Sequence, residues 1–247
     1  VSEPVDNQAY YDEFSGWYER ERGRGYHALI DELEMRIAGP LAQGARVLEA
    51  GCGTGLILQD LASRARHAVG ADLSAGMLRG SAERGLSVVQ ADLTKLPFPD
   101  GLFDVVCSFK VLAHVPPIRE AVAELIRVTR PGGRLILEFY NPWSLRYLAK
   151  RIRPGHVSER LKEDAVYTRW DSAQNVLDLI PKDAATVDAI HGVRVFTPFA
   201  QVHKVPGVAA VFGALERWAV ASPLRWFGGF LVVEMTRAGA DPSPPAG

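Results

Sequence analysis

The stretch V-L-E-A-G-C-G-T-G, from Val47 to Gly55, decides the fold of this chain. Its apolar start predicts a buried strand, and three glycines at alternate positions, Gly51, Gly53 and Gly55, predict a sharp turn. Glycine has no Cβ, so a ligand can approach such a backbone closely. The helix expected from about Leu56 adds unpaired N–H groups and a positive dipole end. The stretch therefore predicts a site for a nucleoside-bearing ligand at the end of the strand.

The spacing of the glycines separates this loop from the dinucleotide-binding pattern G-x-G-x-x-G. Leu56 stands where that pattern has a third small residue, and the order here is G-x-G-x-G. Glu49, two residues before the first glycine, can face a cationic amino group or orient the loop. These features favour S-adenosylmethionine, which carries a sulfonium and an ammonium group but no pyrophosphate. The loop alone also leaves open a Gly-rich turn that binds another nucleotide or nothing.

The next predicted strand also ends in an acid. Residues 68–72 form a short apolar run that stops at Asp72, seventeen residues after Gly55. This is close to the interval at which the second strand of a doubly wound unit presents a carboxylate to ribose hydroxyls. An N-cap or turn role, assisted by Ser74, is the alternative for Asp72.

A third strand is expected over residues 86–93, after a helix over about 75–84. Asp92 near its end can accept a hydrogen bond from the exocyclic amine of adenine, while Leu93 packs against the ring. The alternation of strands and helices predicts an α/β fold.

With these residues the chain resembles the class I S-adenosylmethionine-dependent methyltransferases, of the small-molecule type that includes the ubiquinone and menaquinone methyltransferases. The resemblance covers roughly residues 10–140. Its motifs are E-A-G-C-G-T-G at 49–55, A-D-L-S at 71–74, A-D-L-T-K-L-P-F-P-D at 91–100, F-D-V-V at 103–106 and R-V-T-R-P-G-G-R-L at 127–135. In this family a helix ends at a Pro-Gly-Gly turn that starts the fifth strand. Pro131 suits the end of the helix, and Gly132 and Gly133 suit the turn.

The resemblance implies a single Rossmann-like domain. Its seven-stranded sheet is mostly parallel with the last strand antiparallel, has helices on both faces and carries an N-terminal helical cap. Residues 192–196 and 229–235 are the expected sixth and seventh strands.

The cofactor that the resemblance implies is S-adenosylmethionine. The residues expected to bind it are Tyr11, Tyr18, Glu49, Gly51, Gly53, Asp72, Leu73, Met77, Asp92, Leu93 and Phe109. Two of them have an alternative role. Met77 either lines the adenine side of the site or belongs to the core of its helix. The backbone at Phe109 either lies beside the amino-acid end of the cofactor, or Phe109 is an ordinary core residue.

Residues 1–40 are expected to form the helical cap. The segment from Tyr10 to Glu19 holds five aromatic side chains and resembles the family's Y-D-x-x-A-x-x-Y-D stretch, which folds over the bound cofactor. The resemblance places Tyr11 and Tyr18 near the sulfonium, because cations favour aromatic faces. Anchoring of a helix to the core is the alternative for these rings.

Composition indicates one sizeable domain over residues 41–238. With 247 residues, 47% of them hydrophobic, the chain can bury a full α/β core, and a net charge of −1 argues against a nucleic-acid partner. The N-terminus does not resemble a signal peptide, and no uncharged run reaches the ~18 residues that span a bilayer, so we expect a cytoplasmic enzyme without an integral membrane segment. Cys52 and Cys107 form no zinc spacing or disulfide framework, and we expect no metal.

Two insertions are expected to shape the acceptor pocket. The first, residues 143–181, starts with a basic amphipathic helix over 144–153. This helix is either a solvated surface element or a site of attraction to an acidic substrate, carrier or membrane surface. The second, residues 197–229, is unusually apolar and could be a substrate lid, a homodimer interface or plain core. Residues 239–247, rich in Pro, Ala and Gly, are expected to be disordered.

Methyl transfer needs the acceptor atom, the methyl carbon and the sulfur in line, and most of the acceleration can come from positioning. His114, after the fourth strand, is the leading candidate for a general base by family analogy, with a structural role as the alternative. Tyr140, at the end of the fifth strand, can hydrogen-bond an acceptor. Lys110 is either a contact to an anionic acceptor or a surface residue.

The predicted function is methyl transfer from S-adenosylmethionine to a small, lipophilic or aromatic acceptor. A non-catalytic methyltransferase-like binding protein is the first alternative. An NAD-dependent oxidoreductase is the second, which the glycine spacing disfavours.

Overall fold

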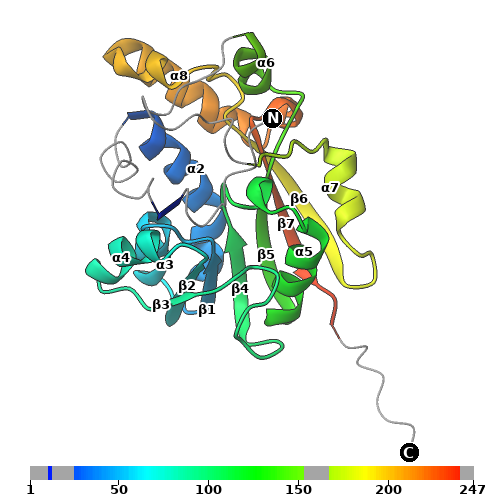
Figure 1. Ribbon diagram of the computed structural model, residues 1–247. Helices are drawn as coiled ribbons and strands as arrows, with labels where there is room; N and C mark the ends of the chain where they lie inside the picture. Colours follow the sequence, from blue (N-terminus) through cyan, green and yellow to red (C-terminus); the bar gives the residue numbers. More distant parts are fainter. Residues whose placement is uncertain (1–10, 13–24, 153–166, 240–247) are drawn as a thin grey trace, which may run out of the picture.

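A seven-stranded sheet forms the centre of the protein in the computed structural model, which describes residues 11–12, 25–152 and 167–239. The strand order is β3-β2-β1-β4-β5-β7-β6 (Figure 1). The strands are β1 (Arg46–Ala50), β2 (His67–Asp72), β3 (Val88–Gln90), β4 (Phe103–Ser108), β5 (Thr129–Tyr140), β6 (Ala185–Val193) and β7 (Phe230–Arg237). Strands β1 to β5 pair in parallel, and β7 is antiparallel to both β5 and β6. The predicted fold class, including the antiparallel last strand, is confirmed.

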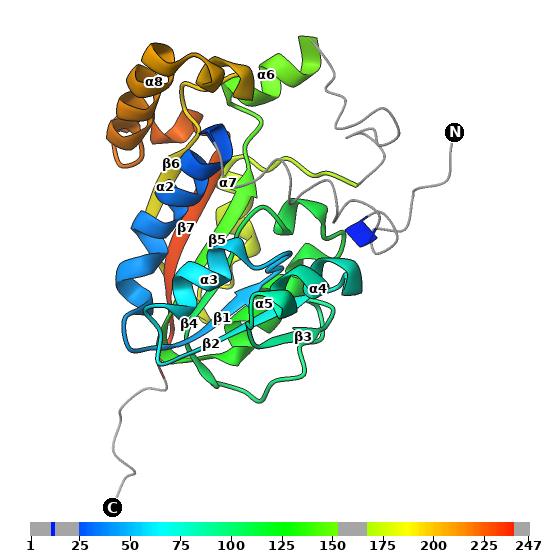
Figure 2. The ribbon, with the colours of Figure 1, turned by 90° about the vertical axis from the view of Figure 1, so that its left-hand side faces the viewer.

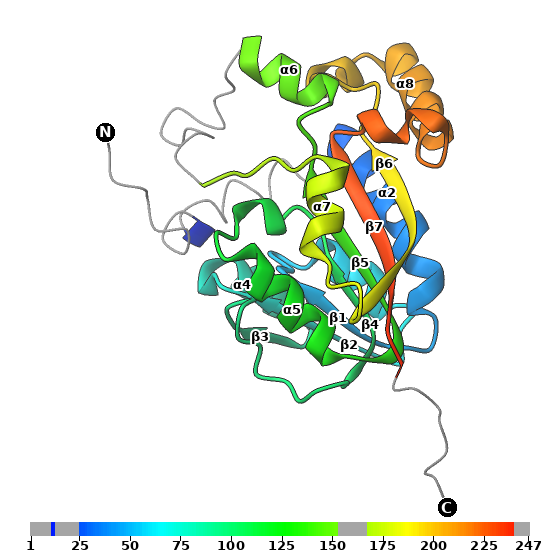
Figure 3. The same cartoon turned by 90° about the vertical axis from the view of Figure 1, so that its right-hand side faces the viewer.

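Helices cover both faces of the sheet: Figure 2 looks onto α2 and α3, and Figure 3 onto α5 and α7. Val105 and Cys107 of β4 pack with α2 and α3, whereas Val106 between them packs with α5 and α7. Each central strand therefore buries both of its faces, which explains its continuous apolar sequence. The helices are α2 (Gly25–Ala42), α3 (Leu56–Ala62), α4 (Ala75–Glu83), α5 (Ile118–Val128), α6 (Leu145–Ile152), α7 (Ala173–Leu179) and α8 (Pro206–Ala219), with short 3-10 helices η1 (Leu112–His114), η3 (Ala200–Lys204) and η4 (Pro223–Phe227).

The Pro-Gly-Gly turn lies inside β5 rather than before it. Helix α5 ends at Val128, ahead of Pro131 as predicted, but β5 already begins at Thr129. The pairing with β4 shifts from Phe103 opposite Thr129 to Val105 opposite Arg134, so the turn is a bulge in the strand.

The prediction of the sixth strand at residues 192–196 is wrong. Strand β6 runs from Ala185 to Val193 and ends because Arg194 has a positive φ of 63°, which a β-strand does not accommodate. Sequence reasoning missed β6 because it is an edge strand in which Asp188 and His191 interrupt the apolar pattern.

Parts of three predicted regions lie outside the described residues: most of the cap before residue 25, residues 153–166 of the first insertion, and the tail from residue 240. Residues 25–40, which were predicted as part of the cap, belong to α2, and this helix packs against the sheet. Within the described ranges, no helix is both long and apolar enough to cross a membrane.

Candidate cofactor and acceptor site

The candidate site lies at the carboxyl edge of the sheet, where the strand order reverses. From β1 the chain proceeds outward through β2 and β3, and from β4 it proceeds the other way through β5. Ligands of open α/β sheets bind at such a switch point, outside the carboxyl ends of the strands. The loop after β1, the ends of β2 and β3, and η1 after β4 all meet at this edge.

The three glycines of the loop all have left-handed backbones. The φ angles are 79° at Gly51, 54° at Gly53 and 83° at Gly55, so an alternative residue at any of them would be strained. A Cβ on Gly51 would lie 2.2 Å from the Cγ2 atom of Val111, whereas one on Gly53 would meet no atom within 4 Å. Gly51 thus permits close internal packing, and Gly53 is the glycine whose open side can receive a ligand.

Asp72 holds the glycine loop to the start of α4. Its Oδ2 accepts from the Gly53 N–H at 2.8 Å, and its Oδ1 accepts from the Ser74 N–H at 2.9 Å. Burial raises the pKa of Asp72 above its ordinary value, against the opposing effect of these hydrogen bonds. The turn role that the sequence left open is therefore present, and binding of ribose hydroxyls to the remaining lone pairs of this carboxylate stays a prediction.

Asp12 also reaches this loop, although sequence reasoning did not single it out. Its Oδ1 accepts from the Ser74 hydroxyl at 2.5 Å and from the Gly76 N–H at 2.7 Å. Those two hydrogen bonds lower the pKa of Asp12. A Cβ on Gly76 would lie 2.9 Å from the Cα atom of Asp12, so only glycine permits this approach. The signal was available, since the aspartate of the family's Y-D stretch falls at this position.

The residues predicted around adenine differ in their exposure. Leu73 is exposed at the end of β2, while Met77 of α4 and Leu93 after β3 are buried. Asp92 is exposed, and its Oδ1 accepts from both the backbone N–H and the hydroxyl of Thr94. Asp92 therefore caps its own turn, and its contact to an adenine amine stays a prediction.

Two further predicted residues are buried beside the loop. Phe109 belongs to the core that α2 covers, which agrees with the alternative weighed for it. Glu49 is buried in β1, and its charge adds to the effect of burial in raising the pKa of the Cys52 and Cys107 thiols. The raised pKa favours the protonated thiol at both positions. Tyr18 lies outside the described residues.

The two predicted catalytic residues meet in the fold. His114 Nδ1 lies 2.9 Å from the Tyr167 carbonyl oxygen, and because a carbonyl only accepts, we assign the proton of the neutral ring to Nδ1. Nε2 is then an acceptor, and it lies 3.5 Å from the Tyr140 hydroxyl. The Tyr11 and Tyr140 rings pack edge-on against the imidazole, with centroid distances of 6.1 and 5.5 Å. The structure thus brings together three residues that the sequence predicted for the site.

Arg146 extends this cluster toward α6. Its Cζ atom lies 4.2, 4.8 and 4.9 Å from the ring centroids of Tyr140, Phe230 and Trp170, which we call the aromatic cage. Its Nη1 atom is buried and has no hydrogen-bond partner among the described residues. Aromatic faces stabilise such a cation, but a buried donor without an acceptor is costly. From the sequence, the basic residues of the helix over 144–153 are either solvated or a site of attraction to an acidic partner, whereas the structure turns Arg146 inward.

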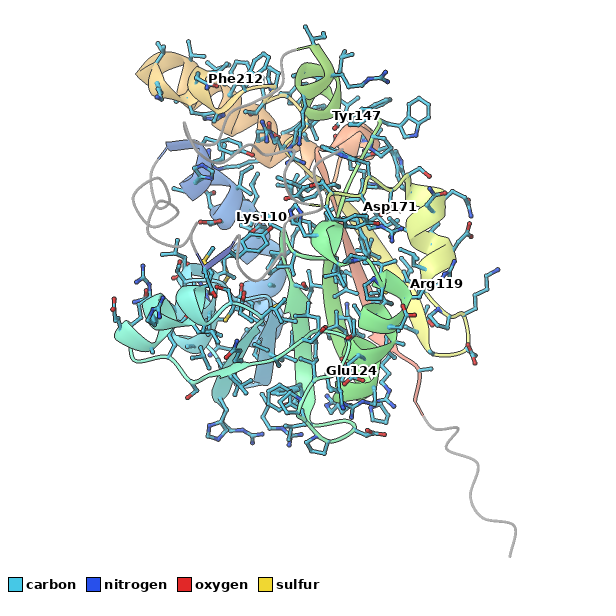
Figure 4. The ribbon with its side chains drawn as sticks, viewed as in Figure 1. Lys110, Arg119, Glu124, Tyr147, Asp171 and Phe212 are labelled. Atoms are coloured by element: carbon cyan, nitrogen blue, oxygen red, sulfur yellow. The ribbon has the colours of Figure 1, made fainter. Side chains whose placement is uncertain are left out.

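Three carboxyl groups surround Lys110, which Figure 4 labels. The Lys110 Nζ donates to Asp31 at 3.0 Å and to Glu34 at 2.7 Å, both on α2, and the Lys110 N–H donates to Glu138 of β5. Burial, and then the charge of Glu34, raise the pKa of Glu138 well above its ordinary value. Lys110 is therefore a structural link to α2 and not a free surface residue, and its contact to an anionic acceptor stays a prediction.

The chain is similar to a protein family, to curated relatives and to solved structures. The family described as "Methyltransferase domain" matches residues 48–137. A demethylmenaquinone methyltransferase of Corynebacterium urealyticum is 41% identical over 103 residues, which are 41% of this chain and 45% of that protein. The chain spans about half the length of the curated relatives that it matches.

Solved structures share the fold. A Thermotoga maritima S-adenosylmethionine-dependent methyltransferase, described as a possible histamine N-methyltransferase, aligns with a TM-score of 0.64 and 18% identity over 93% of this chain and 98% of its own. The [4+2]-cyclase SpnF aligns with a TM-score of 0.66 and 19% identity over 94% of this chain and 95% of its own. These likenesses agree with the resemblance read from the sequence, and the cyclase illustrates that one fold serves different reactions.

Proposed function

Starting from residues 48–137 as a methyltransferase domain of the class I, S-adenosylmethionine-dependent type, we propose that this protein transfers a methyl group from that cofactor to a small aromatic or lipophilic acceptor. The observation that carries the proposal is the loop after β1, where Asp72 fixes the Gly53 N–H and the open side of Gly53 can receive a ligand. The name of the curated relative suggests the finer acceptor class, a hydroxylated ring such as a reduced naphthoquinone.

The residues present fit S-adenosylmethionine. Gly53 leaves room at the backbone, and Asp72 offers carboxylate lone pairs. Leu73 supplies exposed apolar surface just before α4, and Met77 is buried within that helix. The bound cofactor would supply an electrophilic methyl group attached to a cationic sulfur. The protein would contribute position above all, because holding the reacting groups in line can supply ~7–11 kcal/mol in favourable cases.

His114 is the proposed proton acceptor. The Tyr167 carbonyl holds its Nδ1 proton, so Nε2 carries the lone pair and faces the Tyr140 hydroxyl. An acceptor hydroxyl that displaced the weak 3.5 Å contact could transfer its proton to Nε2 directly or through Tyr140. General-base catalysis of this kind is worth roughly 10²–10⁴-fold in rate.

The aromatic cage and Arg146 are the proposed acceptor-binding side of the site. The rings of Tyr140 and Trp170 can stack on an aromatic acceptor, with 5.4 Å between their own centroids. The buried Nη1 of Arg146 can donate to an acceptor oxygen, most strongly when that oxygen carries negative charge. A hydroxylated ring that has lost its proton to His114 would both stack on these rings and accept a hydrogen bond from Arg146.

The test is turnover by the full chain with S-adenosylmethionine carrying a labelled methyl group and a short-chain demethylmenaquinol, generated by reduction of the quinone. We expect label in the extracted acceptor and an equal amount of S-adenosylhomocysteine. Calorimetric titration with S-adenosylmethionine and with NAD is run in parallel. Cofactor binding without turnover across a panel of hydroxylated aromatics would favour a non-catalytic binding protein, and binding of NAD alone would reject the proposal.

A further inference from the structure

Exposed apolar side chains gather at one end of the molecule. In the part of the chain that the structure describes, all but two of the exposed large apolar side chains belong to residues 143–152 and 199–227. These ranges include α6, η3, α8 and η4, and α6 and α8 lie at the same end, beyond the carboxyl edge of the sheet, in all three ribbon views (Figures 1, 2 and 3). We call this end the apolar face. Concentrated apolar exposure of this kind marks an interaction surface.

Helix α6 turns its apolar stripe outward. Leu145, Leu148 and Ile152 share one side of the helix, and all three are exposed, Ile152 to 77%. Arg146 points the other way, into the aromatic cage. A helix that faces water normally buries its apolar stripe and exposes its charges. The reversed orientation indicates that an apolar environment lies outside α6.

Tryptophan is prominent on the same face. Trp143 is 71% exposed before α6, Trp218 is 60% exposed on α8, and Trp226 is exposed on η4. Val211 and Leu215 add aliphatic surface on α8. Tryptophan with flanking aliphatic residues is the side-chain combination typical of the interface between a bilayer and water.

Positive charge exceeds negative charge on the apolar face. The two ranges contain six basic residues, Arg146, Lys150, Arg151, Lys204, Arg217 and Arg225, and a single acid, Glu216. Arg146 points into the aromatic cage and Arg217 is paired with Glu32 of α2, which leaves the other four for the surface. Glu216 is fully buried and accepts from the backbone N–H groups of residues 195–197, so it does not offset them at the surface. Because the whole chain carries a net charge of only −1, this positive excess is local.

We propose that the apolar face docks on the surface of a lipid bilayer that contains anionic lipids. The tryptophan and aliphatic side chains would enter the headgroup region, and the basic residues would approach the phosphates. A second copy of this chain fits less well, because a twofold contact would bring the same basic residues face to face. The inference goes beyond the proposed function and does not depend on it, since docking is measured without cofactor or acceptor.

The test is co-sedimentation of the full chain with vesicles of phosphatidylcholine alone or mixed with phosphatidylglycerol, at low and high salt. We expect binding to the mixed vesicles that weakens with salt. The charge-reversal variant Arg151→Glu with Lys204→Glu should lose at least ~30-fold in partition coefficient, because each basic residue near such a surface is worth about fivefold. The matched control Arg66→Glu with Lys182→Glu changes exposed residues outside the apolar face by the same charge and should bind like the wild type.

A second variant tests the apolar contribution. Trp143→Ser, Leu148→Ser and Ile152→Ser together should weaken binding at every salt concentration, while circular dichroism confirms the wild-type fold. The proposal would be overturned if the wild type did not bind the vesicles. It would also be overturned if the control Arg66→Glu with Lys182→Glu lost as much vesicle binding as Arg151→Glu with Lys204→Glu. A wild-type dimer in sedimentation equilibrium that dissociates in the serine variant would assign the apolar face to a second copy instead.

Discussion

Asp12 and Ser74 lie 62 positions apart in the chain, and the Asp12 Oδ1 atom accepts the Ser74 hydroxyl at 2.5 Å. Ser74 is itself the N-cap of α4, since its Oγ accepts from the Met77 N–H. The part of the N-terminal segment that the structure describes, residues 11–12, is thereby joined to the element that follows Asp72. A negative charge at a helix N-terminus is also favoured by the helix dipole. We infer that cofactor binding and docking of this segment are linked.

We therefore expect Asp12→Asn to lower the affinity for S-adenosylmethionine by ~5–30-fold, because a charge-assisted hydrogen bond is worth about 1–2 kcal/mol more than the neutral one that remains. The folded pKa of Asp12 is lowered, so its contribution is present at neutral pH and is lost as pH falls below the unfolded value of about 4. Calorimetric titration at pH 7 and circular dichroism check both points. Asp183→Asn, at an exposed turn, is the control, and an unchanged affinity in Asp12→Asn would separate the segment from the cofactor site.

Gly53 and Gly85 form a matched pair for testing the loop. Both have positive φ angles, 54° and 74°, and a Cβ on either would meet no atom within 4 Å. Alanine at each should cost about 1–2 kcal/mol of unfolding free energy through backbone strain. Only Gly53→Ala should also abolish measurable cofactor binding, because its open side faces the proposed ligand. Equal affinities in the two variants would place the cofactor elsewhere.

His114 and Tyr140 are expected to affect turnover rather than cofactor affinity. His114→Gln should lower kcat by ~10²–10⁴-fold, because the glutamine cannot take a proton. Tyr140→Phe keeps the ring that packs against His114, so it should lower kcat less than His114→Gln does. Steady-state kinetics with a parallel titration of S-adenosylmethionine separates the two effects. Wild-type kcat in His114→Gln would leave His114 a structural role.

Arg146 should determine how well an oxygen-bearing acceptor binds. Arg146→Met replaces a buried cation without a hydrogen-bond partner by an apolar chain of similar length, so stability should hold or rise while the acceptor KM rises ~10-fold or more. Arg146→Lys keeps the charge but loses the planar guanidinium. Its acceptor KM should lie between those of the wild type and Arg146→Met. Chemical denaturation and kinetics give both readouts. Loss of stability without a change in KM would show that Arg146 only fills the aromatic cage.

Glu138 should make stability depend on pH. Its pKa is raised in the folded state, so the fold is most stable at pH values below the unfolded pKa of about 4.3. As pH rises from there toward the folded pKa, the unfolding free energy falls by up to about 1.4 kcal/mol per pH unit. Glu138→Gln keeps an oxygen for the Lys110 N–H and removes the ionisable group. Its unfolding free energy should be flatter with pH between 5 and 8 than that of the wild type. Parallel curves for the two proteins would contradict the assignment.

Much of the fold could be predicted because its signals are local. A buried strand followed by alternating glycines specifies a strand, turn and helix within ten residues, and the acids of the next two strands lie at fixed places in the same pattern. The edge strand β6 could not be predicted this way, because an exposed edge places polar residues among apolar ones. The seventh strand at Phe230–Arg237 could, because it is buried on both faces.

The sequence by itself determined the glycine loop and the carboxylates at the strand ends, since these depend on neighbours within one or two elements. It also offered His114 and Tyr140 as candidates, through their places after the fourth and fifth strands and the family resemblance. Only the tertiary structure decided that Asp12 reaches Ser74, that Glu138 lies beside Lys110, and that α6 turns Arg146 inward and its apolar stripe outward. Those choices depend on contacts between residues far apart in the chain. Amphipathic spacing defines two faces of a helix, but the surrounding elements fix which of them meets the protein.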